Sequence, residues 1–323
     1  MTDTAVFVSR PHDEGPEASD FYHEVITGLG RSPKRVPPKY FYDEAGSRLF
    51  ESICEQPEYY PTRVETGMLA RYAEEIAGFI GNGCCLVEPG SGSCSKVRLL
   101  LDALRPSRYI PMDISCAHLH EAAGRVANDF PWLDVHAVCA DITRPVKLPG
   151  ISEGMQRVMF YPGSSIGNYE PGEAVKFLSR LAGMAGHGGG LLIGVDLEKD
   201  SRVLDSAYND ANGITADFNL NLLHRINREL DGEIDVDRFR HHAFYNENEG
   251  RIEMHLVSEC TQTLRIDGHS YDFAEGESIH TENSYKYTIA GFRTLAEQAG
   301  FRSDAIWLDD EALFSLHYLS VVS

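Results

Sequence analysis

Short apolar runs alternate with segments of helical periodicity between residues 64 and 196. The runs typical of buried strands are 84–88, 108–115, 133–142, 157–161 and 188–197, and the helical segments are 64–80, 93–105 with a serine at its N-cap, 116–130 and 170–185. A crossover helix brings the chain back to the end of the sheet where the previous strand began, so strands joined in this way run parallel. The sequence therefore predicts an α/β fold, with a parallel, doubly wound sheet covered by helices on both faces.

Residues 197–286 break this alternation. They contain an Asn-rich helical stretch at 207–230 and strands of alternating polarity within 251–266, a pattern typical of an antiparallel sheet. A helix at 292–301 and a strand-rich segment at 312–322 follow, and the latter could rejoin the first sheet. At about 150 residues per domain, the 323 residues fit two structural units, the second being an added module.

Composition excludes several classes of protein. The 29 basic and 49 acidic residues give a net charge of −20, which repels nucleic acid. The longest apolar runs, such as 191–195, are far shorter than the ~20 residues that cross a bilayer, and the N-terminus lacks the order of a signal peptide. We expect a cytoplasmic protein with no membrane or nucleic-acid partner, and a loosely attached leader over residues 1–30, which are rich in Asp, Glu, Pro and Gly.

Seven cysteines form an odd set without a CxxC pair, which favours reduced thiols over a disulfide framework or a zinc site. The HLHE sequence at 118–121 begins like a zinc-protease motif, but Gly124 stands where the second histidine belongs. His241 and His242 are adjacent and therefore point apart along a strand. The sequence predicts no metal site.

The turn after the 84–88 run contains Glu88-x-Gly90-x-Gly92. Glycines at such a turn let the backbone approach a ligand at the carboxyl ends of parallel strands. The NAD-binding fingerprint GxGxxG is not met, because Ser95 occupies its last position. An acidic residue before the glycines resembles instead the first motif of S-adenosylmethionine-dependent methyltransferases.

The next two strands also end in carboxylates. Asp113 stands where it could accept hydrogen bonds from both ribose hydroxyls, and Asp141 could reach an adenine amino group. Three successive strand ends of this kind predict a nucleotide-cofactor site, although a solvated turn would also accommodate Asp113. Lys96, just inside the following helix, could pair with the methionine carboxylate or simply face solvent.

Residues 36–63 crowd aromatic side chains among prolines. Such a segment could be a packed wrap over the core, because aromatic rings bury large areas. It could equally form a pocket wall, because tyrosine combines an apolar ring with a hydroxyl at its tip.

A serine-hydrolase interpretation competes with the cofactor site. Gly163-Ser164-Ser165-Ile166-Gly167 matches the GxSxG turn, residues 187–190 read HGGG, and Asp309 or Asp310 with His317 would complete a triad around Ser165. In that family, however, HGGG precedes the nucleophile, whereas here it follows.

Several blocks together resemble the histidine-specific Nα-methyltransferases of ergothioneine biosynthesis, which convert histidine to its betaine, hercynine. These are PPKYFYDEAGSRLFESICEQPEYYPTR, LVEPGSGSCSK, PMDIS, CADI, PGSSIGN, AYNDANGITADFN, RIEMHL and TENSYK, and the resemblance covers residues from about 30 to the end. It implies a Rossmann-like methyltransferase domain (64–196 plus 287–323) with an added α+β substrate-binding domain (31–63 plus 197–286), and S-adenosyl-L-methionine as cofactor.

The resemblance also implies roles for single residues. Cofactor contacts fall on Gly90, Lys96, Asp113, Asp141 and Ile142. Contacts to the amino acid fall on Tyr59, Gly163, Asn168 and Tyr208, with Glu282 and Ser284 for the imidazole and Met254 for selection of histidine over a larger indole. Tyr42 lies beside the methyl-transfer region, and Tyr42 and Asn168 are the candidate catalytic residues.

Other functions remain open at this point. The chain could methylate tryptophan or another aromatic amino acid, or it could bind the cofactor without catalysis. Without the family blocks, Glu282 could be an ordinary exposed strand carboxylate. We expect a monomer acting on a small molecule.

Overall fold

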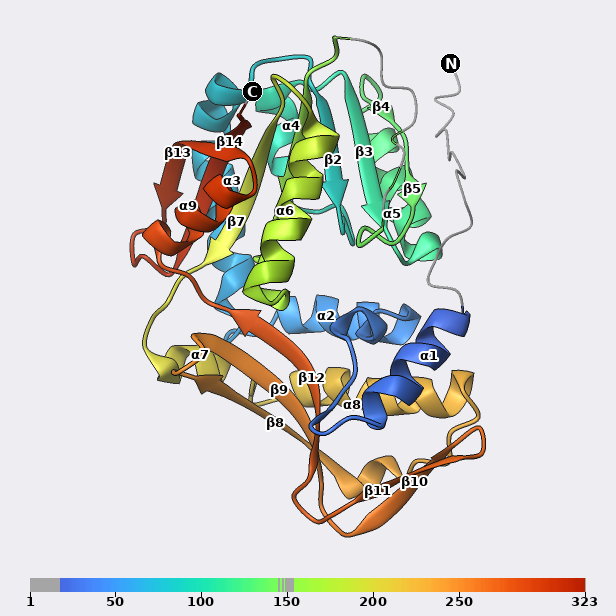
Figure 1. Ribbon diagram of the computed structural model, residues 1–323. Helices are drawn as coiled ribbons and strands as arrows, with labels where there is room; N and C mark the ends of the chain where they lie inside the picture. Colours follow the sequence, from blue (N-terminus) through green and yellow to red (C-terminus); the bar gives the residue numbers. More distant parts are fainter. Residues whose placement is uncertain (1–17, 145, 147, 149–153, 323) are drawn as a thin grey trace. The chain divides into compact units, whose positions relative to one another are not determined.

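The computed structural model describes residues 18–144, 146, 148 and 154–322. These residues divide into two compact units (Figure 1). The first unit comprises Pro61–Glu198 and Lys286–Ser323, and the second comprises the described residues up to Tyr60 together with Lys199–Tyr285. The chain crosses between the units after Tyr60, Glu198 and Tyr285, whereas the sequence predicts domain boundaries at 63/64, 196/197 and 286/287.

The first unit is built on a mixed sheet whose strand order is β13-β14-β7-β6-β2-β3-β4, with β5 also paired to β3. The parallel strands are β2 (Cys85–Pro89), β3 (Arg108–Asp113), β4 (Asp134–Val135), β5 (Val138–Cys139), β6 (Arg157–Tyr161) and β7 (Gly190–Asp196). β14 (Phe314–Val321) pairs antiparallel with β7, and β13 (Phe301–Leu308) antiparallel with β14. The expected α/β fold and the return of the last segment to the sheet are confirmed, but the final two strands are not parallel.

Helices connect these strands and cover the sheet. They are α3 (Tyr60–Ile80), α4 (Arg98–Leu104), α5 (Cys116–Asp129), α6 (Pro171–Ala185) and α9 (Ile289–Gln298). Buried residues of α3, α4 and α5 share one apolar core with the sheet, while Figure 1 shows α6 and α9 in front of it. Every residue of β2 and β7 is buried, as expected for parallel strands covered on both faces.

The helix expected over 93–105 is shorter than predicted. It begins at Arg98, and its N-cap is Val97, which makes no side-chain capping bond. Cys94 has a φ of +54°, a left-handed conformation that cannot belong to an α-helix. The strand expected over 133–142 is likewise divided into β4 and β5.

The second unit contains a four-stranded sheet in the order β1-β12-β9-β8 and a separate hairpin. Its strands are β1 (Lys34–Arg35), β8 (Phe239–Asn246), β9 (Arg251–Ser258), β10 (Gln262–Ile266), β11 (His269–Phe273) and β12 (Ser278–Tyr285), and its helices are α1 (Ala18–Leu29), α2 (Glu44–Cys54), α7 (Ser201–Ala207) and α8 (Ile214–Glu229). β8, β9 and β12 pair antiparallel, which confirms the antiparallel sheet expected from the alternating pattern.

Helix α1 occupies part of the expected leader. Phe21, Val25 and Leu29 recur at helical spacing and are almost fully buried, and the Phe21 ring packs on Tyr40 with centroids 4.6 Å apart. Residues 18–29 are therefore a packed helix rather than a loosely attached segment, and residues 1–17 lie outside the described residues.

Cys116 and Cys139 form a disulfide, with Cα atoms 5.2 Å apart. The expectation that all cysteines are reduced is wrong for this pair. Cys139 ends β5 opposite Asp113 of β3, and α5 begins with Cys116 just after β3 ends. The fold thus brings together two thiols that lie 23 residues apart in the sequence.

Candidate active site

The glycine loop of the first unit follows β2. Gly90 and Gly92 have φ values of +69° and +50°, a left-handed backbone conformation that residues other than glycine rarely adopt. A Cβ atom on Gly92 would meet nothing within 4 Å, and one on Gly90 would meet only Ile142 Cδ1 at 3.9 Å. The loop therefore exposes its backbone to a ligand, and it lies against Ile142.

Asp113 ends the neighbouring strand β3 and is tied to this loop. Its Oδ2 accepts a hydrogen bond from the Gly92 backbone N–H over 2.9 Å, and its Oδ1 accepts one from the Ser115 N–H over 2.9 Å. The carboxylate is half-buried. These two bonds fix its orientation at the carboxyl end of the sheet.

Asp141 follows β5, which pairs with β3. It is buried, and its Oδ1 accepts hydrogen bonds from the Thr143 N–H at 2.8 Å and from Thr143 Oγ1 at 2.6 Å. The structure therefore places Gly90, Asp113, Asp141 and Ile142 at or just after the ends of neighbouring strands of one sheet.

Glu88 precedes the glycines and is fully buried. Burial raises the pKa of its carboxyl to about 8, although a hydrogen bond from the Tyr109 hydroxyl and the positive charge of Lys96 act in the opposite direction. Desolvation penalises the ionised form more strongly than these two groups stabilise it. Glu88 is therefore an acid held largely neutral beneath the loop at pH 7.

Lys96 does not face solvent freely. Its Nζ forms an ion pair with Glu65 Oε2 over 2.5 Å. Glu65 is a fully buried residue of α3, and its two carboxylate oxygens also accept from the Gly163 N–H at 3.0 and 2.9 Å. The structure thus brings Lys96 and Gly163 together through Glu65.

The sequence motifs did not point to Glu65, although its place in the apolar pattern of α3 is informative. It stands four residues before Leu69 and eleven before Ile76, on the buried side of α3. A charge on the apolar stripe of an amphipathic helix is rare unless it is paired. Such a position therefore indicates a buried ion pair with a partner elsewhere in the chain.

The second glycine turn carries Asn168. Residues Ser165–Asn168 form a 3-10 helix, η2, preceded by Ser164 at a φ of +55°. Ser164 Oγ accepts a hydrogen bond from the Asp196 N–H over 2.8 Å. Asp196 in turn forms a buried ion pair of 2.8 Å with Lys286, a second pair that no local sequence pattern indicated.

The residues of the hydrolase alternative do not form a triad. His317 is fully buried on β14, and its Nε2 lies 2.9 Å from Ser315 Oγ rather than bonding to Ser165. Burial lowers the pKa of His317 to about 4. Asp309 accepts from the backbone N–H groups of Glu311 and Phe314 at the turn before β14.

In the second unit, Tyr208 and Ser284 are in direct contact. Tyr208 follows α7, Ser284 lies on β12, and the Tyr208 hydroxyl donates to Ser284 Oγ over 2.8 Å. Both side chains are buried. This bond joins two residues of the predicted substrate site.

Met254 and Glu282 are cross-strand neighbours. Met254 of β9 pairs in register with Glu282 of β12, just after an irregularity between His280 and Glu282. Both residues are buried. The thioether and the carboxylate are thus adjacent on the sheet that also carries Ser284.

An aromatic cluster includes Tyr59, whose ring lies 6.2 Å from that of Tyr208 and 6.3 Å from that of Phe50 (centroid distances). Tyr42 packs on Phe50 with centroids 5.7 Å apart. Burial raises the pKa of Tyr59 well above its usual value, and the nearby Tyr208 and Glu282 add to this effect. The Tyr59 hydroxyl therefore stays protonated and can donate a hydrogen bond.

The predicted site residues are thus distributed over both units. Gly163, Asn168 and the cofactor residues belong to the first unit, while Tyr42, Tyr59, Tyr208, Met254, Glu282 and Ser284 belong to the second. Among the described residues, no helix is long and apolar enough to cross a membrane.

The strand order of the first unit, its glycine loop and the carboxylates after β3 and β5 define a Rossmann-like enzyme domain for a nucleotide cofactor. Residues 21–321 match the family of histidine-specific, S-adenosylmethionine-dependent methyltransferases. The chain belongs to this family, which confirms the resemblance seen in the sequence, and its cofactor is S-adenosylmethionine.

Three relatives illustrate the range of the family. Histidine N-alpha-methyltransferase of Mycobacterium tuberculosis is 40% identical over 91% of this chain and 92% of that protein. Ergothioneine biosynthesis protein 1 of Neurospora crassa is 32% identical over 91% of this chain and 34% of that protein. L-tryptophan methyltransferase of Psilocybe serbica is 25% identical over 90% of each chain.

The first unit fits this cofactor on its own geometry. The Gly90–Gly92 loop leaves room for close backbone approach. Asp113 is anchored through backbone N–H groups and is half-buried at a strand end, which suits a carboxylate that accepts from a ribose diol.

Proposed function

We propose that this chain methylates the α-amine of L-histidine and that successive transfers give Nα,Nα,Nα-trimethylhistidine, hercynine. The observation that carries the proposal is the buried bond from Tyr208 to Ser284 on β12, the strand that also holds Glu282. It gathers hydroxyl and carboxylate groups beside an aromatic cluster, as recognition of a polar heteroaromatic amino acid requires. The 40% identity to a histidine N-alpha-methyltransferase supports the same substrate.

Five residues of the first unit would hold S-adenosylmethionine, which supplies an electrophilic methyl group when bound. Asp113 would accept from the ribose hydroxyls and Asp141 from the adenine amino group, with Gly90 and Ile142 against the nucleoside. Lys96 carries three N–H donors, and Glu65 takes one of them. The others can bind the methionine carboxylate.

Residues of the second unit would orient histidine. Glu282 would accept a hydrogen bond from the imidazole N–H, and Ser284 would form a hydrogen bond with the other ring nitrogen. Tyr59 would donate to the substrate carboxylate, because burial keeps its hydroxyl protonated. Tyr208, whose own proton is donated to Ser284, would accept a hydrogen bond from the substrate α-amine. Met254, beside Glu282, would limit the space available to an indole.

Asn168 and Gly163, which belong to the first unit, complete the proposed contacts to the amino acid. An amide group offers both a donor and an acceptor, so Asn168 could hold the substrate α-amine with its lone pair in one direction. Alignment and desolvation of this amine would supply most of the rate enhancement, since in-line displacement needs no covalent nucleophile. The proton lost before each transfer goes to water or a nearby oxygen.

The aromatic cluster would accommodate the growing cation. Tyr42, Phe50 and Tyr59 present ring faces and edges within one group. A quaternary ammonium group is attracted to aromatic faces by their quadrupole. We therefore propose Tyr42 as a catalytic residue; retention of full rate and of trimethylated product by Tyr42→Phe would show only that its hydroxyl is dispensable.

The direct test mixes purified protein with S-adenosylmethionine and, separately, histidine, tryptophan or tyrosine, and follows products by mass spectrometry. We expect mono-, di- and trimethylated histidine in sequence and no methylated tryptophan or tyrosine. Methylation of another amino acid but not histidine would contradict the roles of Glu282 and Ser284. Accumulation of a monomethyl product would contradict the three-step reaction.

The roles of the domains, the cytoplasmic location and the monomeric state expected from the sequence stay predictions. Size-exclusion chromatography with light scattering tests the last of these directly, because a monomer has a mass of 35.9 kDa.

A further inference from the structure

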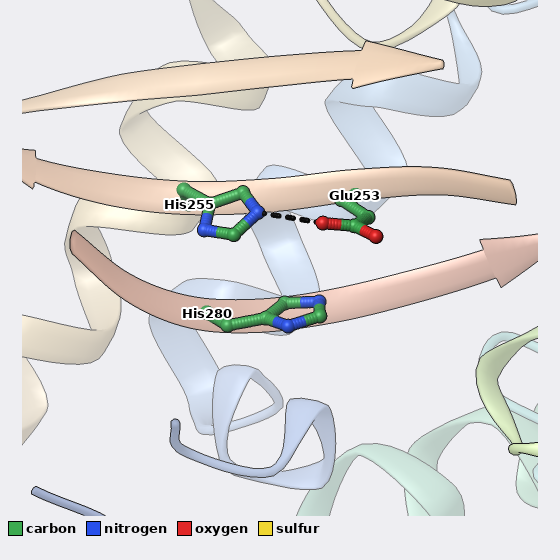
Figure 2. A group of neighbouring side chains, drawn as sticks. All are labelled: Glu253, His255 and His280. Carbon is green, nitrogen blue, oxygen red and sulfur yellow. Dashed lines mark hydrogen bonds and ion pairs between the residues drawn. The ribbon is translucent and has the colours of Figure 1, made fainter. Parts of the chain in front are cut away.

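We propose that Glu253, His255 and His280 form a binding site for a divalent transition-metal ion of the zinc type. The three residues lie on β9 and β12 of the second unit, and one potential ligand atom from each lies within 4.8 Å of the others. Figure 2 shows the two imidazoles on neighbouring strands with the carboxylate beside them.

Strand pairing brings the three side chains together. His255 and His280 are directly opposite in the antiparallel register, and their rings stack with centroids 4.6 Å apart. Glu253 lies two residues before His255, so both side chains project from the same face of β9. Met254 lies between them on the other face, which separates the proposed metal site from the proposed imidazole contacts.

The donor set suits zinc. Zn²⁺ binds histidine nitrogen and carboxylate oxygen at about 2.0–2.2 Å, and two such ligands around a tetrahedral ion are roughly 3.4 Å apart. Glu253 Oε2 and His255 Nε2 are already 3.1 Å apart. For His280 to complete a site of two nitrogens and one oxygen, its ring would have to turn so that Nδ1 faces the other two ligands, and water could take the remaining position.

Outer hydrogen bonds orient both imidazoles. His280 Nε2 lies 3.1 Å from the Glu282 backbone carbonyl oxygen, which can only accept, so Nε2 carries the proton and Nδ1 has the lone pair. His255 Nδ1 lies 3.2 Å from Ser278 Oγ. Metal-binding histidines characteristically use their second ring nitrogen in this way.

Glu253 uses its two oxygens differently. Glu253 Oε1 accepts from Arg251 Nη2 at 2.8 Å and from Asn246 Nδ2 at 3.0 Å. These bonds and the one from His255 favour the ionised form of the carboxylate. Its second oxygen, Oε2, points to His255.

Burial of the two imidazoles opposes their protonation. Although Glu253 acts in the opposite direction on both, burial lowers the pKa of His255 and of His280. His242 of β8 lies opposite His255 in register and adds to the effect on it. Asn283 lies beside His280.

Binding of the ion at His255 Nε2 would move the proton of that imidazole to Nδ1 and leave the total number of protons unchanged. Without metal, His255 Nε2–H can donate to Glu253 Oε2. When the ion occupies this position, the proton is carried instead by Nδ1, where Ser278 Oγ can accept it. No oxidant or other reactant is required.

The test uses the full chain without a polyhistidine tag, stripped with a chelator and with its free thiols alkylated. Equilibrium dialysis against Zn²⁺, followed by metal analysis, should show one saturable ion per chain that Mg²⁺ does not displace, since Mg²⁺ prefers oxygen ligands. His280→Asn should weaken binding at least tenfold. His187→Asn is the matched control, because His187 is an exposed histidine outside the cluster, and it should bind like the parent.

A second variant distinguishes loss of the metal site from misfolding. Glu253→Gln should give the same loss of Zn²⁺ affinity, and far-UV circular dichroism without metal should establish that at least one of the two variants is folded. Equal affinity of a folded variant and the parent would overturn the site. So would the absence of saturable Zn²⁺ binding by the parent chain.

Discussion

The Tyr208 hydroxyl donates a hydrogen bond to Ser284 Oγ across 2.8 Å in the interior of the second unit. The two residues are 76 positions apart in the sequence, and they come from a helix end and a strand. A serine oxygen can accept this bond while its own O–H is a separate donor. The bond therefore fixes the relative orientation of two side chains that we propose to contact the substrate.

Tyr208→Phe should raise the KM for histidine. Removal of one neutral hydrogen bond costs about 0.5–1.5 kcal/mol, which corresponds to roughly 2- to 12-fold. The KM for S-adenosylmethionine should stay unchanged, as steady-state kinetics with each substrate varied can show. Tyr271→Phe is the control, because its hydroxyl bonds to the Ile26 carbonyl beside the hairpin. Equal effects of the two variants would contradict the proposed role.

Glu282→Gln should lower kcat/KM for histidine. Loss of a charged acceptor costs about 1.5–3 kcal/mol, or roughly 10- to 150-fold, and discrimination against phenylalanine should fall with it. Competition assays with paired amino acids measure this ratio. Glu275→Gln, at an exposed turn position, should leave the ratio unchanged. A Glu282 variant that still discriminates like the parent would place imidazole recognition elsewhere.

Local patterns in the sequence were sufficient for most of the first unit. The runs that became β2, β3, β6 and β7 are short, apolar and bounded by turns, so their periodicity and length identify them. The sequence did not predict β13, because this strand follows α9 directly after Gly300 and most of its side chains are exposed or only partly buried. Its pairing with β14 is a tertiary contact that no local pattern specifies.

The site shows the same division. The positions of Gly90, Asp113 and Asp141 could be predicted because each lies at or just after the end of a strand, and strand ends of a parallel sheet converge. Their roles stay predictions. The ion pair of Lys96 with Glu65 and the disulfide of Cys116 with Cys139 join distant segments. Such partners follow from the three-dimensional arrangement, and a single sequence specifies only that a buried charge must have one.

Gly194→Ala should destabilise the first unit. A Cβ atom at this position of β7 would lie 1.9 Å from Glu65 Oε1 and 2.9 Å from the Phe314 ring. Glu65 cannot move away without breaking its bonds to Lys96 and Gly163. We expect a loss of about 1–3 kcal/mol, as for other overpacked cores, together with weaker S-adenosylmethionine binding by calorimetry.

Gly124→Ala is the matched control for that glycine substitution. Gly124 lies inside α5, and a Cβ there would meet nothing within 4 Å. Because alanine favours a helix by about 0.5–1 kcal/mol over glycine, this variant should be slightly more stable than the parent in denaturant unfolding. If Gly194→Ala were as stable as Gly124→Ala, Glu65 would not be held rigidly between β7 and the glycine turn.

The buried Glu88 carboxyl should make stability fall as pH rises. Its pKa is raised from 4.5 to about 8 in the folded protein by burial, so between these values the folded state binds a proton that the unfolded state has lost. Linkage then reduces the free energy of unfolding by about 1.4 kcal/mol per pH unit across that interval.

Glu88→Gln removes this dependence, because the amide is neutral and its oxygen can still accept a hydrogen bond from Tyr109. Denaturant unfolding of both proteins at pH 5, 6, 7 and 8 should therefore show the variant gaining stability relative to the parent at each step, with other titrating groups cancelling in the difference. Parallel curves for the two proteins would mean that Glu88 is ionised throughout, stabilised by Lys96 and Tyr109 despite its burial.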